Sequence, residues 1–242
     1  MNGEKDTQIK MPDLDKWNKY YINAEKNRTD PPWESKEPFH ALKDWFKAEG
    51  LYAKDLIKLK TSEKLKIIEL GSGASYSSVW LAEQGHNVFA IDVSPEAIKR
   101  AESFDTKKKV NWICADLLDN QFFEINKNIE KESFDVLFDM QCFHVLRTKD
   151  ENKSVEIMFD LLKKGGKLMI VVGASLEPYA KENIQTDSAN NSGPPKIFID
   201  DFLIPLTNKG FKALSVKLSR FNKTLAYGDN PPFCWVGIFE RQ

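Results

Sequence analysis

Lys66-Ile67-Ile68-Glu69-Leu70-Gly71-Ser72-Gly73-Ala74-Ser75 is the stretch that decides the fold. The apolar segment 66–70 predicts a strand, a Gly-Ser-Gly turn follows it, and 75–84 predicts a helix that ends at Gly85. Glycines let the backbone turn tightly and let a ligand approach it closely. In open parallel sheets, ligands bind at this end of the strands. The stretch therefore predicts a ligand site at the first strand-to-helix turn of an α/β protein.

Strands and helices alternate along the chain after this turn. Further strands are predicted at 87–91, 110–114, 134–138 and 167–173, and a closing pair at 211–221 and 234–240. Helices are predicted to start at Ser94 and to run over 150–162 and 200–208, and 187–195 is predicted to be a loop or flap. This alternation favours a parallel sheet covered on both faces, with the closing pair as an antiparallel edge.

The first 38 residues differ from the rest of the chain. They are polar, two consecutive prolines at 31 and 32 interrupt them, and they carry the aromatic residues Trp17, Tyr20, Tyr21 and Trp33. We predict a short helix at 14–23, an irregular segment through the prolines, and a helix over 38–59. Residues 1–38 are therefore treated as a separate N-terminal segment. Residues 39–242 are treated as one domain, which the length of 242 residues allows.

The composition narrows the class of protein. Hydrophobic residues make up 41% and charged residues 29%, and the net charge is −1, so we expect a globular protein without nucleic-acid partners. The short run Lys107-Lys108-Lys109 is interpreted as a solvated loop. The opening residues contain no signal-peptide core, and the apolar run 168–174 is too short to span a bilayer. The three cysteines are isolated and no metal-binding spacing is visible, so we expect no metal and a cytoplasmic, monomeric protein.

Glu69 indicates which ligand the glycine turn could hold. The dinucleotide fingerprint requires a third glycine where Tyr76 stands, and a tyrosine there would obstruct a pyrophosphate. An acid beside the turn is also a poor neighbour for a diphosphate. It suits a ligand that bears an ammonium or sulfonium charge, and S-adenosylmethionine carries both. The alternative is that Glu69 is merely a surface residue before a loop.

Two more acids follow the next two predicted strands. Asp92 lies roughly 20 residues past the glycines, where an acid can accept hydrogen bonds from both ribose hydroxyls. Asp116 follows the third strand and can accept a hydrogen bond from an adenine amino group, while Leu117 packs on the ring. Each aspartate alone could simply cap a helix or a turn. Three acids after three successive strands favour an adenosine site.

These segments together resemble the class I S-adenosylmethionine-dependent methyltransferases. The likeness rests on Glu69–Gly73, on 91–94, on Ala115-Asp116-Leu117, on 134–139 and on 161–167. It implies a Rossmann-like, doubly wound, seven-stranded and mostly parallel sheet in the order 3-2-1-4-5-7-6, with strand 7 antiparallel. It also implies S-adenosylmethionine as cofactor, S-adenosylhomocysteine as product, and Gly71, Ser72, Gly73, Val93 and Ala115 as further cofactor-binding residues. Ser75 departs from the family's common third glycine.

A finer likeness points to a branch that acts on small molecules. Trp17, Pro32-Trp33-Glu34, 139–144 and Gly193-Pro194-Pro195 resemble thiopurine, thiol or methyl halide, and tellurite-resistance methyltransferases. The resemblance implies that residues 1–38 form a helical lid over the cofactor. It places Trp33 near the methionine end of the cofactor, with Asp139 and Met140 lining that end from below. The expected acceptor is a small molecule, most readily a thiol or a similar soft nucleophile.

The chemistry of transfer needs few protein groups. Methyl transfer requires alignment of donor and acceptor, and a thiol with a pKa of about 8.5 can react without a dedicated base. His144 is the candidate base, and the alternative is a histidine bonded to backbone in the loop after the fourth strand. Cys142 is interpreted as a packing residue. Three other functions stay open: a protein lysine methyltransferase, a non-enzymatic cofactor-binding protein, and a nicotinamide enzyme, which Glu69 and Tyr76 disfavour.

Overall fold

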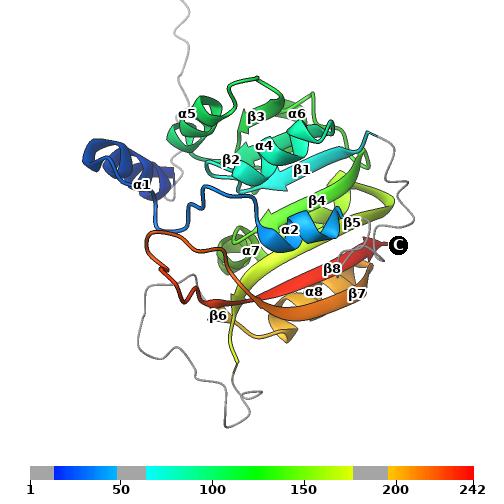
Figure 1. The fold of residues 1–242 in the computed structure, drawn as a ribbon. Helices are drawn as coiled ribbons and strands as arrows, with labels where there is room; N and C mark the ends of the chain where they lie inside the picture. The colour runs from blue at the N-terminus through cyan, green and yellow to red at the C-terminus, as the bar shows by residue number, and fades with distance from the viewer. Residues whose placement is uncertain (1–13, 48–63, 177–195) are drawn as a thin grey trace, which may run out of the picture.

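The computed structural model describes residues 14–47, 64–176 and 196–242, and a central β-sheet runs through them (Figure 1). The strands are β1 Lys66–Leu70, β2 Asn87–Asp92, β3 Val110–Cys114, β4 Phe134–Met140, β5 Leu162–Ala174, β6 Lys196–Ile197, β7 Phe211–Arg220 and β8 Phe233–Arg241. They lie in the order β3-β2-β1-β4-β5-β8-β7, and β6 pairs with β5. β8 is antiparallel to β5 and to β7, whereas the other pairings are parallel.

This topology confirms the predicted strand order. The closing strands expected at 211–221 and 234–240 are β7 and β8, because the short strand β6 comes before them in the chain. The predicted order 3-2-1-4-5-7-6 is therefore the observed order β3-β2-β1-β4-β5-β8-β7. The two-residue strand β6 was not predicted. The predicted 187–195 loop, including Gly193-Pro194-Pro195, lies outside the described residues.

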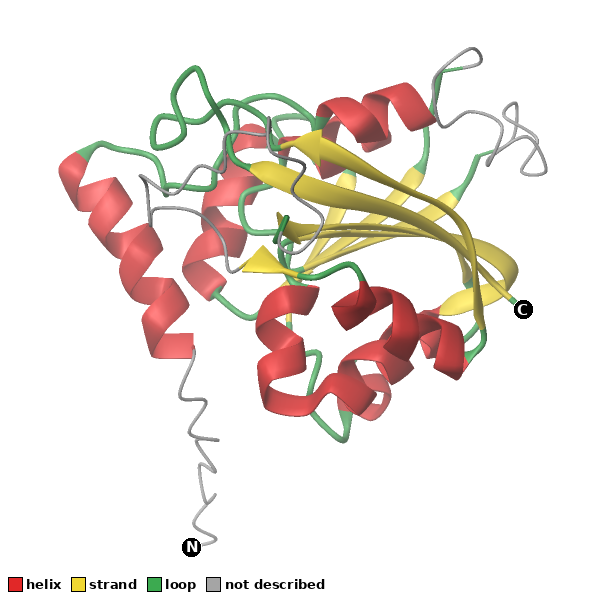
Figure 2. Cartoon of the chain, turned by 90° about the horizontal axis from the view of Figure 1, so that it is seen from below, coloured by secondary structure: helices red, strands yellow, loops and turns green. Residues whose placement is uncertain are grey.

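Helices cover both faces of the sheet (Figure 2). They are α1 Leu14–Asn27, α2 His40–Trp45, α4 Tyr76–Glu83, α5 Pro95–Phe104, α6 Phe122–Ile125, α7 Phe143–Leu161 and α8 Asp200–Lys209. Alternate strand residues point to opposite faces, so Ile68 packs with apolar residues of α7 and α8, whereas its neighbour Ile67 packs with α2 and α4. Both isoleucines are fully buried. Strands that are buried on both faces explain the continuous apolar runs in the sequence.

Two predicted helices differ from the observed ones. The helix expected over 38–59 begins at His40, and α2 ends at Trp45; positions 48–59 lie outside the described residues. The helix expected to start at Asp150 starts at Phe143 instead. Asp150 interrupts α7 with φ −153° and ψ 94°, and its carboxylate accepts a hydrogen bond from the Lys153 N–H at 2.9 Å. Asp150 therefore caps the second half of a kinked helix, which is why the sequence pattern placed the start there.

The N-terminal helix packs away from the sheet, against α5 (Figure 1). The hydroxyl of Ser94, which caps α5, lies 2.6 Å from Oδ1 of Asn18 on α1. The chain after α1 then runs beside the loop between β7 and β8, where the side-chain amide of Asn222 donates to the carbonyl of Pro38 at 3.0 Å. The carboxyl ends of the strands thus lie near the N-terminal segment.

Candidate functional site

The glycine turn after β1 is built for close backbone approach. Gly71 and Gly73 have φ values of +58° and +55°, which glycine adopts without strain. A Cβ atom on Gly71 would lie 2.5 Å from Sγ of Cys142, and one on Gly73 would lie 2.5 Å from Oη of Tyr21. Either substitution would therefore combine strain with a clash. Ser75 caps α4 by accepting the Ser78 N–H at 3.1 Å, which gives a use for the residue that replaces the third glycine.

Asp92 ends β2 beside this turn. Its Oδ2 accepts the Gly73 N–H at 2.8 Å, and its Oδ1 accepts the Ser94 N–H at 2.8 Å. Burial raises the pKa of its carboxyl above the ordinary value, against the effect of these backbone hydrogen bonds. Each carboxylate oxygen keeps a lone pair with which it could accept a ribose hydroxyl. The predicted cofactor-binding residue Val93 follows it, at the entrance to α5.

Glu69 and Asp139 lie deeper than the sequence suggested. Glu69 is only 2% exposed and accepts a hydrogen bond from the Ser78 hydroxyl, and Asp139 is fully buried and accepts the Phe143 N–H at the start of α7. Burial raises the pKa of each carboxyl to about 7, and each is further raised by a neighbouring acid. Both carboxyls lie near the carboxyl ends of the neighbouring strands β1 and β4, close to the glycine turn, and each is about half ionised at pH 7. Their direct contact with a ligand stays a prediction.

The turn after β3 continues the same edge. The Ala115 N–H donates to the Asp92 carbonyl at 3.0 Å, so the ends of β2 and β3 are joined here. Asp116 accepts the Leu118 N–H at 2.8 Å. Leu117 is 5% exposed and packs in the main core with Phe122, so most of its surface is already covered by protein. Its packing on an adenine ring stays a prediction.

These acids share one electrostatic feature. In the parts of the chain that the structure describes, no lysine or arginine forms an ion pair with the carboxylates of Glu69, Asp92, Asp116 or Asp139. Burying the carboxylates of Glu69, Asp92 and Asp139 without a positive partner is costly, as the raised pKa values of these three groups reflect. A cationic ligand would supply the missing charge, whereas a diphosphate would add to the repulsion.

The N-terminal segment places two aromatic residues at this edge. The Trp33 Nε1–H donates to Oη of Tyr21 at 3.2 Å, and the two rings meet edge-on with centroids 6.2 Å apart. Tyr21 is 4% exposed, and burial raises the pKa of its phenol, so the hydroxyl above Gly73 stays protonated. Trp33 also packs edge-on against Trp17 and Tyr20.

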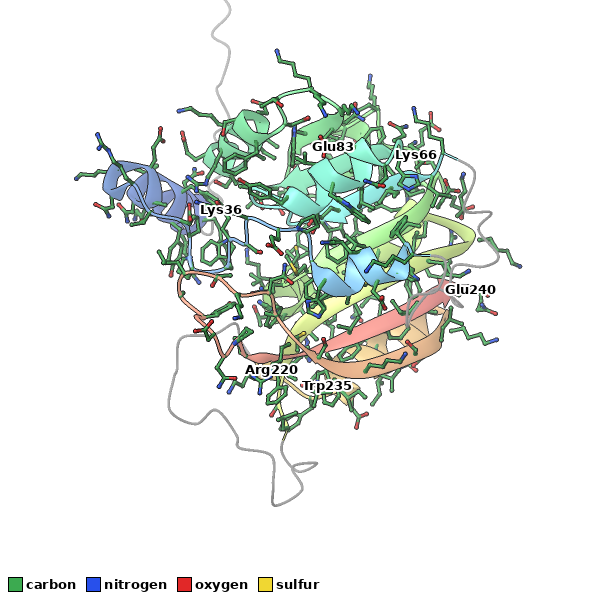
Figure 3. All side chains as sticks on the ribbon, in the orientation of Figure 1. Lys36, Lys66, Glu83, Arg220, Trp235 and Glu240 are labelled. Carbon is green, nitrogen blue, oxygen red and sulfur yellow. The ribbon has the colours of Figure 1, made fainter. Side chains whose placement is uncertain are left out.

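An ion-pair network holds this segment to α5. Nε and Nη2 of Arg100 donate to the two oxygens of Glu34 at 2.8 and 2.7 Å, and Nη2 also contacts Asp30 at 2.6 Å. The Glu34 side chain is 2% exposed. Lys36 adds an exposed pair to Asp30 and lies on the α1 side of the molecule (Figure 3). The bidentate pair fixes the residue next to Trp33.

A hollow opens between three segments at the carboxyl end of β4. Its space of about 220 Å³ includes volume that is open to solvent, and it is lined by Trp33, Ser35, Met140, Gln141, Phe221, Asn222, Thr224 and Tyr227. Trp33 and Met140 were predicted to lie at the methionine end of the cofactor. The hollow therefore adjoins the predicted cofactor site.

The two candidate reactive residues lie in different settings. His144 is in the first turn of α7, not in a loop as the alternative interpretation had it; it is 3% exposed, and burial lowers its pKa to about 4. Its Nδ1 has no hydrogen-bond partner in the described part of the chain, and it does not line the hollow. Cys142 packs directly against Gly71, and burial raises the pKa of its thiol. The thiol is therefore neutral at pH 7.

Sequence reasoning did not assign site roles to Tyr21, Gln141 and Tyr227. Tyr21 could have been found from the spacing of Tyr21 and Ala24, which form the buried stripe of α1. Gln141 follows β4 directly and has a φ of +69°, which is uncommon outside glycine. Nothing in the local sequence marks Tyr227, because its partners lie far away in the chain.

The residues at this edge fit S-adenosylmethionine. The glycine turn leaves the backbone open where a Cβ would fill the space, Asp92 and Asp116 offer acceptors for ribose and adenine, and the neighbouring acids have no cationic partner among the described residues. In the described ranges, no group of three His, Cys, Asp or Glu side chains is arranged to hold a metal ion. The described helices also include none that is long and apolar enough to cross a membrane.

A family model described as "Methyltransferase domain" matches residues 68–170. Among curated proteins, the chain is 26% identical over 174 residues to the tRNA N(3)-methylcytidine methyltransferase trm140 of Schizosaccharomyces pombe, which covers 69% of this chain and 51% of that protein. The chain spans about half or less of the length of the curated relatives it matches. The expectation of no nucleic-acid partner therefore has no support from its relatives.

Solved structures share the fold. The structure described as "Conversion of a Disulfide Bond into a Thioacetal Group during Echinomycin Biosynthesis" has a TM-score of 0.66 at 19% identity, over 95% of this chain and 92% of that one. The 1,6-didemethyltoxoflavin-N1-methyltransferase of Burkholderia thailandensis, with bound 1,6-didemethyltoxoflavin and S-adenosylhomocysteine, has a TM-score of 0.59 at 15% identity, over 100% and 93%. TehB of Haemophilus influenzae has a TM-score of 0.53 at 15% identity, over 80% and 63%.

The likeness to the tellurite-resistance branch is thus supported at the level of the fold. The sheet order, the glycine turn with its row of acids, and the matched domain agree with one another. Residues 68–170 therefore match a methyltransferase domain, and the sheet order agrees with the fold that the resemblance to class I S-adenosylmethionine-dependent methyltransferases implied.

Proposed function

We propose that the chain transfers a methyl group from S-adenosylmethionine to a small molecule, most readily a thiol or a similar soft nucleophile. When bound, the cofactor supplies a methyl group on a positively charged sulfur. The observation that carries the proposal is the set of acids around the glycine turn that have no cationic partner in the described structure. A thiol acceptor would lose its proton to solvent, because a pKa of about 8.5 leaves a fraction of it ionised near neutral pH.

Each part of the chain has a role in this proposal. Residues 1–38 act as the lid and 39–242 as the catalytic domain. The backbone of Gly71, Ser72 and Gly73 contacts the cofactor. Asp92 accepts hydrogen bonds from the ribose hydroxyls, and Asp116 accepts one from the adenine amino group. His144 is the candidate base from the sequence, but its pKa of about 4 makes it a weak base at pH 7 and it does not line the hollow.

Two observations support a small acceptor. The N-terminal segment crosses one side of the hollow, where the Thr224 hydroxyl donates to the Pro32 carbonyl, and this limits the space for an acceptor. In addition, the neighbour from Burkholderia thailandensis binds a small molecule beside S-adenosylhomocysteine. A second candidate function is tRNA methylation, which the relative from Schizosaccharomyces pombe favours.

Methyl-labelled cofactor separates these functions. The full chain is incubated with the label and, in separate reactions, with a panel of thiols, with total tRNA and with cell lysate. Label in small-molecule products is expected. Label mainly in tRNA or on protein bands would contradict the small-molecule proposal and favour the second candidate or a protein methyltransferase. The variant Asp92→Asn is the control that should lose the label in every reaction.

A further inference from the structure

Among the residues that the structure describes, the hollow beside β4 is lined by no side chain that would be charged at neutral pH. These lining residues are aromatic, apolar or neutral and polar, and the one titratable group among them is the phenol of Tyr227. Burial raises the pKa of Tyr227 to about 12, so the phenol keeps its proton at pH 7. A carboxylate, phosphate or ammonium group in this hollow would lose its water shell without gaining a described partner of opposite charge.

Three of the polar lining residues are already engaged within the protein. The Asn222 amide donates to the carbonyl of Pro38 and to Oγ of Ser35, and its oxygen lies 2.9 Å from Nδ1 of His40. The Ser35 hydroxyl also pairs with the backbone of Glu37. The Thr224 hydroxyl donates to the Pro32 carbonyl at 2.8 Å and accepts the Tyr227 N–H at 3.1 Å. These contacts tie the loop after β7 to the N-terminal segment and leave little capacity for a ligand.

Gln141 and Tyr227 retain hydrogen-bonding capacity. Their side chains are hydrogen-bonded to each other, which uses one of the amide's four possible hydrogen bonds. Gln141 is held in a left-handed conformation, φ +69°, while its N–H donates to the Val171 carbonyl at 2.9 Å. Strained positions of this kind persist where the surrounding structure fixes them, and they occur often at binding sites. The pair therefore offers a fixed, neutral donor and acceptor.

Aromatic side chains form the remaining walls. Trp33 lines the hollow from the N-terminal segment, and Phe221 and Tyr227 line it from the loop after β7, with their ring centroids 6.2 Å apart. Flat ligands stack on such rings. We propose that this hollow is the acceptor site and that it selects planar molecules without charge apart from the reacting group, with Gln141 and Tyr227 pairing with their polar edge. This inference rests on the proposed function.

Three aryl methyl thioethers, which imitate methylated products, test the charge preference without requiring turnover. Their substituents are a neutral methoxy group, a carboxylate and an aminomethyl group that is an ammonium at pH 7. Calorimetry is done on the full chain with saturating S-adenosylhomocysteine. The neutral ligand is expected to bind about tenfold more tightly than either charged one, because each charge would be partly desolvated without a partner.

Variant Gln141→Glu is then expected to reverse this order in favour of the ammonium ligand. Gln84→Glu adds the same charge at an exposed helix end and should leave the order unchanged. Equal or tighter binding of a charged ligand by the unmodified chain, no binding of any thioether, or no effect of Gln141→Glu would overturn the inference. Failure of S-adenosylhomocysteine to bind would instead contradict the proposed function.

Discussion

The amino and carboxyl ends of the parallel strands differ in whether their acidic side chains have cationic partners. At the amino ends of the strands, Lys167 pairs with Glu240 at 2.7 Å, and Lys163 pairs with Asp135 at 2.7 Å (Figure 3 labels Glu240, on the same side as Lys66). At the carboxyl ends, Glu69 and Asp139 are buried with raised pKa values and have no described cationic partner. The acids named at the amino ends are paired with lysines, whereas those named at the carboxyl ends would gain a partner only from a bound cation.

This difference separates stability from function. A paired charge at the amino end contributes to the free energy of unfolding, whereas an unpaired buried carboxylate reduces it. A protein tolerates such a cost where binding requires it. Substitutions at the two ends should therefore have opposite effects on stability and on cofactor affinity, and the following experiments test that contrast.

The largest effect is expected from Asp92→Asn. The substitution removes the charge that accepts the ribose hydroxyls, so affinity for S-adenosylhomocysteine should fall roughly a hundredfold, given about 1.5–3 kcal/mol for each hydrogen bond to a charged group. The melting temperature of the ligand-free protein should change little, because losing a buried carboxylate without a cationic partner offsets losing one of its two backbone hydrogen bonds. Calorimetry and thermal unfolding measure the two quantities.

Asp135→Asn is the matched control at the other end of the sheet. Asp135 accepts the Lys66 N–H at 2.8 Å and pairs with Lys163, so its loss should lower the free energy of unfolding by about 1 kcal/mol and leave cofactor affinity unchanged. If both variants lost stability and both kept affinity, the contrast between the two ends would be wrong.

Arg100→Met should produce the next largest effect, and it tests how the lid is held at the carboxyl end. Glu34 would be left buried without its bidentate partner. Breaking a fully buried pair costs about 3–5 kcal/mol, but Arg100 is 21% exposed, so we expect roughly 2 kcal/mol of lost stability together with weaker cofactor binding. Lys99→Met removes an exposed charge on the same helix and should change neither. Equal stabilities for the two variants would show that the network does not anchor the lid.

The architecture could be predicted from the sequence because it depends on local patterns. Short apolar runs that are buried on both faces mark β1, β2 and β4, and the glycine turn marks the start of α4. The start of α7 could not be found in this way. Its first turn depends on the carboxylate of Asp139, whereas the capping pattern in the sequence belongs to the kink at Asp150.

Contacts in the candidate site could be predicted only where both residues lie close together in the sequence. Asp92 and Gly73 are 19 positions apart, and their contact follows from one strand-helix-strand unit. Tyr227, in the loop after β7, contacts Gln141, which lies 86 positions earlier in the chain. No periodic pattern in the sequence predicts that contact. The near-complete burial of Glu69 could not be predicted from the sequence, since it depends on how the chain packs around it.

The dependence of binding on pH should be of intermediate size. The pKa values of Glu69 and Asp139 are about 7 in the ligand-free protein, so at pH 6 each is mostly neutral and cannot attract the ammonium group of S-adenosylhomocysteine. Affinity should rise about tenfold between pH 6 and pH 8, as for one carboxyl that must ionise. Adenosine has no ammonium group, and its affinity should stay nearly constant.

The same shifts make an opposite prediction for stability. Both carboxyls have pKa values raised above the unfolded ones, so the native state holds more protons than the unfolded state between about pH 4.5 and pH 7. Stability of the ligand-free protein from these groups is therefore present below this range and is lost as the pH rises through 7. A flat binding curve for S-adenosylhomocysteine, equal to that of adenosine, would place these acids too far from the ligand to matter.

Tyr21→Phe should have the smallest effect, and it asks whether neutral groups also contribute at the carboxyl end. The change removes the hydroxyl above Gly73 and leaves the Trp33 Nε1–H without its acceptor. A lost hydrogen bond of this kind costs about 1 kcal/mol, so stability should fall by about that amount and cofactor affinity by roughly fivefold or less. Tyr20→Phe is the control, because its ring is 41% exposed and contacts the same tryptophan. If the two variants behaved alike, packing of Trp33 rather than the Tyr21 hydroxyl would hold the lid over the turn, and the carboxyl end would differ from the amino end in its charges alone.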